Sequence, residues 1–506
     1  MKYLFIYFSA LFLLFSPLFV EGAPVKTFKD YNVILFFVDT LRADHLGCYG
    51  YPKATSPNID KLAGESFVFK ENFSTASFTF PSFTSINTSL YPNSHGVYMA
   101  FKDKLSPRAS TLAEILNMYG YKTAWLGPLN DPHLDLLAGF GRGFDEFIGQ
   151  SSSYDVKKKK VIFLNWLEEN RGKKFFFNAH TYKMHSPYFP SPEYKERFTK
   201  IKSMKGVIDN EDSLLERTCE ILREGQRGRD IVDRFLGKEL YDEFSASGLL
   251  NADAQRIISF FNVSEKKYKI APLKNFAYWR EIDLSDPAVN AYVQSLYDAC
   301  IREYDEEVIG PVIEKLKDLR IYDKTIIIIC SDHGEEFYEH GKHGHGLTLY
   351  GEATHVPLII RVPRVKRGKG IKELTQTVDI MPTLLDLLGI PIPHQAQGKS
   401  LAGLMNKRTN AHPQKYVFGK LQIISSIRSK EWLFLLNNDS QKRELYHLYS
   451  DPREQKNVYP ENKDAALKLE SELKKWEASL PSYQDKEYPF DPGIDEATQE
   501  RIRKTG

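Results

Sequence analysis

Two runs of consecutive apolar residues stand out along the chain because polar and apolar positions do not alternate in them. Residues 32–39 read NVILFFVD and residues 324–332 read KTIIIICSD, so both are rich in Val, Ile and Phe, and both end in aspartate. Strands that are apolar on both faces are typical of the buried middle of a parallel sheet. The pattern therefore predicts two buried strands here, and similar runs predict further strands at 121–127 and 173–180.

Helical patterns lie between the predicted strands. Residues 110–120, STLAEILNMYG, end at a glycine that suits a helix stop. A chain that alternates strands with helices folds as α/β, and we predict a doubly wound, mostly parallel sheet with helices on both faces. Ligands of such sheets bind beyond the carboxyl ends of the strands. Asp39, His180 and Asp332 stand at such ends, so we expect them to share one site.

The first 22 residues have the layout of a secretory signal. Lys2 precedes an apolar run through Val20, and the small residues Gly22 and Ala23 follow it. This order predicts a cleaved signal peptide at 1–22 and export to the periplasm or the extracellular space. Because the run approaches the length that spans a bilayer, an uncleaved anchor that holds the protein near a membrane is the alternative.

Changes in the pattern of apolar and charged residues divide the remaining chain into segments. Residues 23–406 carry the predicted strands and form the expected catalytic domain. Within them, residues 191–290 are charged and mostly helical, which predicts an insertion that covers part of the site. Residues 407–506 combine short strands, one helical segment and a Pro-rich tail, which predicts a small C-terminal α+β subdomain.

Composition narrows the choice of partners. The 506 residues include 68 Lys and Arg against 66 Asp and Glu, and 42% of them are hydrophobic. Such a chain buries a large core, and its net charge of +2 gives no overall field that would attract nucleic acid. Four scattered cysteines exclude a disulfide framework. We expect Cys48 and Cys330 to be buried thiols. The sequence does not decide whether Cys219 and Cys300 form a disulfide bridge.

Thr79 stands at the predicted start of a helix within residues 77–97. Pro81 suits the first helical turn, and the apolar positions after it have helical spacing. Taken alone, a threonine at such a place is usually an N-cap. A helix N-terminus also concentrates unpaired N–H groups, so a hydroxyl there faces a natural site for phosphate or sulfate. The hydroxyl becomes a nucleophile once a metal or a base takes up its proton.

Candidate metal ligands follow the second buried run directly. Asp332 and His333 place a carboxylate beside an imidazole, a pair that suits Zn²⁺ or Mn²⁺, and Asp39 offers another carboxylate. Lys183 could neutralise a substrate oxyanion, although a surface role is the alternative. Seven of the 13 histidines fall in two short stretches and could bind metal or phosphoryl oxygens, with solvated loop positions as the alternative. They are His180, His185, His333, His340, His343, His345 and His355.

The order of short motifs along nearly the whole mature chain resembles the sulfatase family of the alkaline phosphatase superfamily. The match begins with NVILFFVDTLRADHLGCYG, SPNID and SFTFPSF. It continues through GFGRGFDEF, HTYKMHSPY, TIIIICSDHGEE, GHGLTLYGEATHVPLIIRVP and LYHLYSDPREQKNV. The resemblance implies the α/β fold of that family and a metal-dependent enzyme that acts on phosphate or sulfate esters.

The catalytic motif departs from that of sulfatases that use formylglycine. Those enzymes carry Cys or Ser followed by x-Pro-x-Arg, whereas residues 79–83 here read Thr-Phe-Pro-Ser-Phe. Formylglycine cannot arise at Thr79. In addition, Thr40 replaces a second metal-binding Asp, residues 127–130 replace Gly-Lys-x-His, and His345 replaces a substrate-binding Lys.

The stretch TFPSFTSINTSLYPNSHGV resembles instead the threonine-nucleophile motif of nucleotide pyrophosphatase/phosphodiesterases. It is also similar to the threonine enzymes that transfer phosphoglycerol or phosphoethanolamine on cell envelopes. These resemblances imply that Thr79 is the nucleophile and that one divalent ion, Mn, Zn, Mg or Ca, is bound. The metal ligands that they imply are Asp39, Thr79, Asp332 and His333.

The same resemblance assigns roles to the nearby histidines. His185 and His345 would contact the non-bridging oxygens or assist the leaving group. A second metal needs an Asp and two His, and His345 with either His180 or His185 would supply part of that set. We place His180 and Lys183 among the substrate-binding residues.

We therefore predict a metal-dependent hydrolase or transferase that cleaves or transfers a phosphoester through a covalent Thr79 intermediate. Its substrate would be a small molecule or an envelope or glycan ester. Two alternatives remain: a sulfuric ester hydrolase without formylglycine, and a catalytically inactive sulfatase-like binding protein. The presence of Asp39, Asp332, His333 and a hydroxyl at position 79 argues against the binding protein.

Overall fold

A computed structural model provides the structure of the chain. It describes residues 27–99, 103–127, 139, 141–148, 155–224, 238–261, 270–364, 369–406 and 413–483. The predicted signal peptide at 1–22 lies outside these residues.

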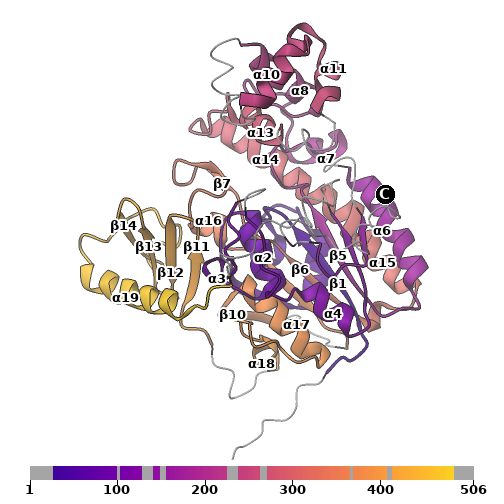
Figure 1. Cartoon of the computed structure of the whole chain (residues 1–506), viewed down its shortest axis with the longest axis vertical. Coiled ribbons are helices and arrows are strands. Elements are labelled where there is room, and N and C mark those ends of the chain that lie inside the picture. The colour runs from indigo at the N-terminus through magenta and orange to yellow at the C-terminus, as the bar shows by residue number, and fades with distance from the viewer. Residues whose placement is uncertain are drawn as a thin grey trace, which may run out of the picture.

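An eight-stranded sheet forms the centre of the catalytic domain (Figure 1). Every strand runs parallel to its neighbours except β9, which is antiparallel to both β2 and β6. The two apolar runs form β1 and β6, which pair with each other in the middle of the sheet and are buried along their whole length. The predicted doubly wound α/β fold is confirmed. In spatial order the strands are β10 (Lys369–Gln376), β2 (Phe67–Phe73), β9 (Leu358–Arg361), β6 (Thr325–Cys330), β1 (Asn32–Val38), β5 (Phe175–Thr181), β3 (Lys122–Leu126) and β4 (Glu146–Ile148).

Alternate side chains of β1 pack against helices on opposite faces of the sheet, as the period of a strand requires. Ile34, Phe36 and Val38 share a core with one set of helices: α1 (Pro57–Ala63), α6 (Val156–Asn170), α14 (Pro287–Tyr304) and α15 (Gly310–Asp318). Val33, Leu35 and Phe37 share a second core with α2 (Thr79–Thr88), α4 (Leu112–Met118) and α17 (Ile380–Leu388).

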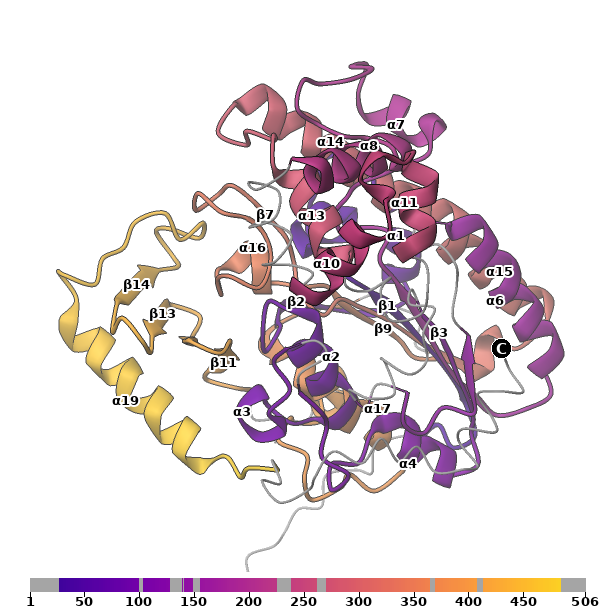
Figure 2. The same ribbon diagram turned by 45° about the horizontal axis from the view of Figure 1, so that its top comes forward.

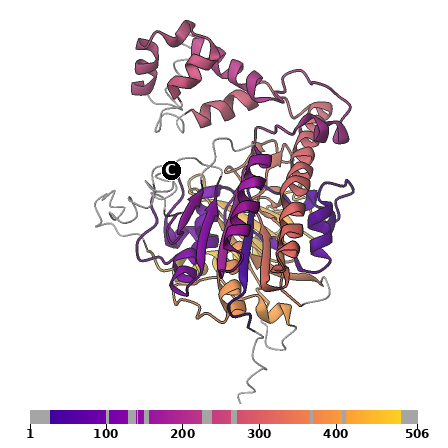
Figure 3. The same ribbon diagram turned by 90° about the vertical axis from the view of Figure 1, so that its right-hand side faces the viewer.

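A group of helices follows β5 and stands at one end of the molecule, beyond the sheet (Figure 3). Its side chains Leu214, Leu240, Phe244 and Ile257 are buried and belong to the α14-side core. The group occupies the range in which an insertion was expected. Its helices are α7 (Pro192–Phe198), α8 (Glu211–Arg223), α10 (Lys238–Ala246), α11 (Ala254–Phe261) and α13 (Ala271–Trp279).

A four-stranded antiparallel sheet and one long helix make up the C-terminal subdomain. α19 (Lys463–Ser479) covers the outer face of this sheet, as Figure 2 shows, with Leu469 and Leu473 in their shared core. The other face contributes Leu433 and Leu435 to a cluster with Ala76, three residues before Thr79. The subdomain therefore supports the segment that leads into α2. Its strands are β11 (Val417–Lys420), β12 (Ile424–Arg428), β13 (Trp432–Asn437) and β14 (Arg443–His447).

Shorter elements lie in the connections. They are α3 (Pro92–His95), α16 (Gly351–Thr354), α18 (Ala402–Met405), β7 (Glu336–Phe337), β8 (His343–Gly344), the 3₁₀ turns η1 (Ala43–His45), η2 (Gly47–Tyr49), η3 (Leu249–Asn251), η5 (Tyr322–Lys324) and η6 (Thr377–Asp379), and the π-helical turn η4 (Asp305–Ile309).

The four cysteines are free thiols. Cys330 is buried as expected, whereas Cys48 is only partly buried. Cys219 on α8 and Cys300 on α14 are both buried, and they form no disulfide bridge. Among the helices in the described part of the chain, none combines the length and the apolar character needed to cross a bilayer.

An ion pair fastens the loop at 338–343 to α16 and to the C-terminal subdomain. His340 contacts the carboxylate of Glu352 through Nδ1, and its Nε2 lies 2.8 Å from the carbonyl oxygen of Glu454. Burial by itself would lower the pKa of His340, but the hydrogen bond and charge of Glu352 outweigh it and raise the pKa to about 9.

We predict that the protein loses stability as the pH rises from 6.5 to 9. The folded state binds the His340 proton more tightly than the unfolded state, so its contribution is complete below the unfolded pKa of about 6.5 and disappears as the pH passes through about 9. Because the pair lies close to solvent, we expect a loss of only about 1 kcal/mol in urea unfolding. His340→Gln should flatten this slope, and His394→Gln, at an exposed histidine, should not. A wild-type stability that rises over this range would contradict the prediction.

Candidate active site

The carboxylates of Asp39 and Asp332 meet because their strands are neighbours. β1 and β6 are parallel and in register up to Phe37 and Cys330, so both aspartates leave the sheet at the same edge. Thr40 then turns the chain with a φ of 56°, a left-handed conformation that is uncommon for a β-branched residue. This turn brings the N–H of Thr40 to 3.4 Å from Oδ1 of Asp332.

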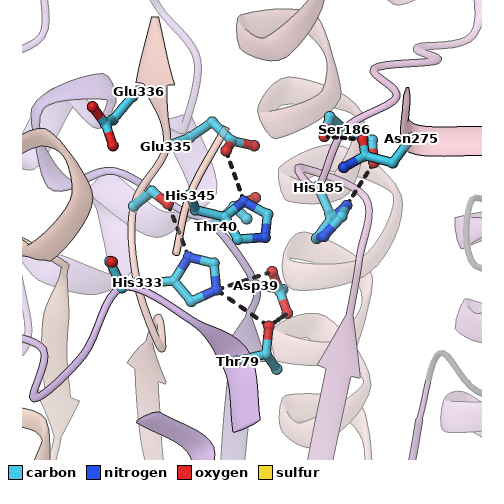
Figure 4. A network of polar contacts seen from close by, with 12 residues as sticks. Asp39, Thr40, Thr79, His185, Ser186, Asn275, His333, Glu335, Glu336 and His345 are labelled. Carbon is cyan, nitrogen blue, oxygen red and sulfur yellow. Dashed lines mark hydrogen bonds and ion pairs between the residues drawn. The ribbon is translucent and has the colours of Figure 1, made fainter. Parts of the chain in front are cut away.

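Thr79 is the first residue of α2 and faces Asp39 and His333, two of the three other metal-ligand candidates (Figure 4). Phe78 occupies the N-cap position, so the Thr79 hydroxyl does not cap its own helix. Its Oγ1 donates to Oδ2 of Asp39 at 3.2 Å and lies 3.2 Å from Nε2 of His333. The apolar positions of α2 hold this orientation because Phe83 is buried in the core behind it.

The tautomer of His333 follows from a backbone contact. Its Nδ1 lies 2.9 Å from the carbonyl oxygen of Gly334, which can only accept, so Nδ1 carries the proton and Nε2 presents a lone pair. Burial lowers the pKa of His333 well below its usual value, so the ring is neutral. A carbonyl that fixes the far nitrogen in this way is typical of a metal-binding histidine.

Asp39, Asp332 and His333 fit a divalent cation. Their ligand atoms lie within 4.8 Å of one another, and all three residues are fully buried. Oδ1 of Asp39 and Oδ2 of Asp332 are buried without a hydrogen-bond partner among the described residues. Buried polar atoms need a partner, and the single proton of Thr79 can satisfy only one of the two acceptors that it faces. Two carboxylates, an imidazole and a hydroxyl are a donor set that suits Mn²⁺, Mg²⁺ or Zn²⁺.

The pKa values of the two aspartates show the same need for a cation. Burial, together with the negative charges of Asp332 and Glu335, raises the pKa of Asp39 well above its usual value. Burial also raises the pKa of Asp332 to about 6. Two carboxylates this close resist ionising together unless a positive charge is added.

His345 lies beside His333 and pairs with a buried glutamate. The two imidazole rings are 4.4 Å apart, and Nδ1 of His345 is 2.8 Å from Oε1 of Glu335. The second oxygen of Glu335 accepts from the Tyr188 hydroxyl at 2.8 Å. Burial works against a charged His345, but the Glu335 carboxylate prevails and raises the pKa of His345 above its usual value.

His185 has the opposite character. Its ring lies 4.8 Å from that of His345, and its Nδ1 donates to the carbonyl oxygen of Ser186 at 2.6 Å. Burial, with the nearby charge of His345, lowers the pKa of His185 to about 4. The site therefore holds one histidine that favours the protonated form and one that stays neutral with Nε2 free to accept a proton.

His180 joins the site at its edge. Its Nε2 is 3.6 Å from Oδ2 of Asp39, and its ring stacks on Phe83 and Trp125. Burial lowers the pKa of His180 well below the usual value. Both ring nitrogens are buried without a hydrogen-bond partner among the described residues, so His180 has unused capacity beside Asp39.

Lys183 does not reach Thr79. Its Nζ forms a buried ion pair with Glu303 of α14 at 2.9 Å and donates to the carbonyl oxygen of Phe189 at 2.8 Å. It borders a separate cavity of about 220 Å³ next to Glu211. The placement gives no support to the predicted substrate-binding role, because Lys183 lies on the α14 side of the sheet whereas Thr79 lies on the α2 side.

Three of the loop histidines are engaged elsewhere. His340 binds Glu352, His355 contacts the carbonyl oxygen of Lys70 at 2.7 Å, and His343 lies against the ring of Trp279. Sequence reasoning gave Glu335 and Tyr188 no role. Glu335 was visible in the motif after His333, but its partners lie 10 and 147 residues away along the chain.

Comparison with known proteins identifies the family of the chain. The sulfatase family model matches residues 31–390, and the model of the C-terminal region of N-sulphoglucosamine sulphohydrolase matches residues 339–479. The chain belongs to the sulfatase family, and it is thus a hydrolase of the alkaline phosphatase superfamily.

Two individual relatives show how much sequence identity the chain shares with known sulfatases. N-acetylglucosamine-6-O-sulfatase of Bacteroides thetaiotaomicron is 25% identical over 476 residues, which cover 85% of this chain and 83% of that protein. Human arylsulfatase K is 31% identical over 195 residues, or 36% of each chain.

Two solved structures share the fold at a TM-score of 0.66 each. One is a protein in complex with its substrate D-glucosamine-2-N,6-O-disulfate, at 22% identity over 92% of this chain and 100% of that chain. The other is the phosphonate monoester hydrolase of Agrobacterium radiobacter, at 20% identity over 88% of this chain and 95% of that chain.

We predict that chelation destabilises the wild-type protein and that Asp332→Asn removes this sensitivity. Saturating Mn²⁺ or Zn²⁺ should raise the melting temperature by roughly 5 °C over protein in EDTA, because a ligand that binds only the folded state stabilises it. Asp332→Asn removes one ligand and one buried negative charge, so it should melt no lower than wild type in EDTA and gain little from metal.

Asp379→Asn is the matched control for this measurement. Asp379 is also fully buried, but it accepts from the backbone N–H groups of Gln376 and Lys399. This variant should keep the full metal-dependent rise. Equal metal responses in the two variants would show that the ion binds elsewhere.

Proposed function

We propose that this protein hydrolyses or transfers a phosphoester group through a covalent intermediate on Thr79. The observation that carries the proposal is the buried Thr79 hydroxyl, 3.2 Å from both Asp39 and His333 at the start of α2. It stands where sulfatases that use formylglycine carry the Cys or Ser that is converted.

The single hydroxyl of threonine favours phosphorus over sulfur. A hydrated formylglycine has two hydroxyl groups, so one can form the ester while the other drives its elimination. Thr79 has one, and its ester must be broken by attack of water or an alcohol on the central atom. That two-step displacement is the route of covalent phosphoryl transfer.

The residues of the site divide the chemistry among them. Asp39, Thr79, Asp332 and His333 would hold a divalent ion, which when bound supplies Lewis acidity and lowers the pKa of a hydroxyl. The N–H groups that open α2 lack carbonyl partners within the helix, and with the helix dipole they favour phosphoryl oxygens beside Thr79.

Proton transfer falls to the two histidines with opposite pKa shifts. In the first step the Thr79 oxygen bonds to phosphorus, its proton moves towards Asp39, and the departing oxygen takes a proton from His345. In the second step His185 accepts a proton from water or an acceptor alcohol, whose oxygen displaces Thr79 from phosphorus. Thr79 then regains its proton from Asp39, and His185 returns one to His345. Two groups whose surroundings separate their pKa values are suited to such acid and base roles.

A sulfate ester is the second candidate substrate. The family and the N-acetylglucosamine-6-O-sulfatase relative favour a sulfate ester. The likeness to a phosphonate monoester hydrolase is in keeping with a phosphorus substrate. We place the enzyme outside the cytoplasm, on the layout of residues 1–22, with a small-molecule or glycan ester as substrate. A binding protein would have no use for a paired His345 against His333 or for a neutral His185 beside that pair.

We predict that the metal-loaded protein turns over an aryl phosphate or phosphodiester faster than an aryl sulfate. Thr79→Ala should lose about 10³-fold or more in kcat because the nucleophile is gone. Thr79→Ser, which keeps the hydroxyl, should retain activity within about tenfold. Mass spectrometry of the quenched wild-type enzyme should find a phosphoryl group on Thr79. Turnover of the sulfate alone would sink the proposal, and tight metal binding without turnover would favour a binding protein.

We predict that Glu335→Gln lowers turnover of esters with poor leaving groups more than turnover of esters with good leaving groups. The neutral amide that this change introduces cannot hold His345 as an imidazolium, so kcat/KM for an alkyl phosphoester should fall by about 10². A nitrophenyl ester, whose leaving group needs no proton, should fall by less than about tenfold. Glu336→Gln, the same change at the next residue, should leave the dependence on leaving-group pKa as in wild type. Equal losses on both esters would show that Glu335 only supports the fold.

A further inference from the structure

A groove far larger than the cavity beside Lys183 lies between the catalytic domain and the C-terminal subdomain. Its volume is about 1100 Å³. Its walls are the loop at 42–51, β2, β10, α16 and the turns at 428–430 and 448–455, and we call it the interdomain groove. Thr79, Asp39, Asp332 and His333 do not border it, so it is separate from the proposed active site.

Two buried side chains present unused nitrogen atoms to the interdomain groove. His45, only 3% exposed, donates from Nδ1 to Oδ1 of Asp298 at 2.7 Å. Arg428, 7% exposed, binds Glu454 through Nη2 and lies over the ring of Phe73. Within the described chain, Nε2 of His45 and the Nε and Nη1 groups of Arg428 have no hydrogen-bond partner. Groups this deeply buried gain from a ligand that completes their bonding.

Three cations surround these groups at the rim. Lys372, Lys430 and Arg453 border the groove, are exposed, and come from β10 and from two turns of the subdomain. No carboxylate among the described residues pairs with any of them. Positive charges that gather around a concave site raise the local concentration of anions, even though the net charge of the whole chain is only +2.

Aromatic rings and, within the described chain, one unpaired carboxylate also line the groove, whose other acidic side chains are held in ion pairs. Asp44 and Glu339 pair with Arg42, Glu352 pairs with His340, and Glu454 pairs with Arg428. Tyr449 is 70% exposed at its rim, and Tyr51 and Phe73 also border it. Glu71 faces it without an ion-pair partner among the described residues. Aromatic faces pack against the apolar faces of sugar rings, and a carboxylate accepts hydrogen bonds from hydroxyl groups. A nucleic acid strand would meet Glu71 with an unbroken row of phosphates, which disfavours it.

We propose that the interdomain groove binds an acidic oligosaccharide, a chain of sugar rings that carries sulfate or carboxylate groups. The cations and the buried Arg428 contact the acid groups, Tyr449 stacks on a ring, and Glu71 and His45 bond to hydroxyls. The groove thus holds a glycan apart from the catalytic centre, and its occupation does not depend on the reaction at Thr79.

Binding of labelled octasaccharides to the full mature chain tests the proposal. The probes are a heparin-derived chain with sulfates, a polygalacturonate chain with carboxylates, a neutral chain of equal length, and inorganic polyphosphate. Changing Lys372, Lys430 and Arg453 together to Gln should weaken binding of an acidic octasaccharide at least about tenfold. Tyr449→Ala should weaken it about fivefold through the loss of ring packing.

Matched controls separate the groove from general charge and from the active site. Changing Lys202, Lys324 and Lys468 to Gln removes the same charge from exposed positions outside the groove, and affinity should stay within about twofold. Asp332→Asn should also leave the affinity of the probe unchanged, and the groove triple variant should keep full turnover of a small aryl ester. Because affinity is measured without turnover, failure of the proposed function at Thr79 would leave this result intact.

Preference for either acidic octasaccharide over the neutral one supports the proposal and identifies the acid group. Three results would overturn it. The first is equal binding of the probe by the triple variant of the groove cations and by the triple variant of the control lysines. The second is binding of polyphosphate as tight as that of the oligosaccharides, with no effect of Tyr449→Ala. Loss of binding in Asp332→Asn alone would place the probe at the catalytic site.

Discussion

Two neighbouring parallel strands deliver two carboxylates into one buried space, and the rest of the site is arranged around that constraint. Asp39 follows β1, Asp332 follows β6, and each keeps one oxygen without a hydrogen-bond donor among the described residues. Carboxylates buried this closely cost free energy unless a cation or a proton neutralises them. His333 and Thr79 turn further electron-pair donors towards the same point. The geometry that suits a cation is therefore also the geometry that positions the hydroxyl.

The histidines around this centre differ because their partners differ. His345 faces the carboxylate of Glu335, which favours the imidazolium, whereas His185 donates to a backbone carbonyl and stays neutral. Both histidines are partly buried, so burial alone would lower both pKa values. A single buried carboxylate thus separates an acid from a base within one site, and the roles proposed for the two residues follow from that difference.

The C-terminal subdomain serves both the catalytic centre and the interdomain groove. Its sheet packs beside Ala76 in the segment before Thr79, and the N–H of Lys420 donates to the carbonyl oxygen of Thr75 at 2.8 Å. On another side its turns bring Arg428 and Tyr449 opposite β2 and β10. A subdomain docked in one orientation supports α2 and closes one wall of a second, chemically distinct surface.

The sequence by itself determined the buried strands, the α/β order, the strand-end aspartates and the threonine at the start of a helix. These features depend on the period of apolar residues and on direct neighbours in the chain, which a sequence displays. Pairing across elements needed the tertiary structure. From the sequence, Lys183 was a candidate for substrate binding, but in the structure it pairs with Glu303 of α14. Glu335 has a role only because its two oxygens contact His345 and Tyr188. Which faces of distant helices and loops come together is decided by packing, and no local pattern records it.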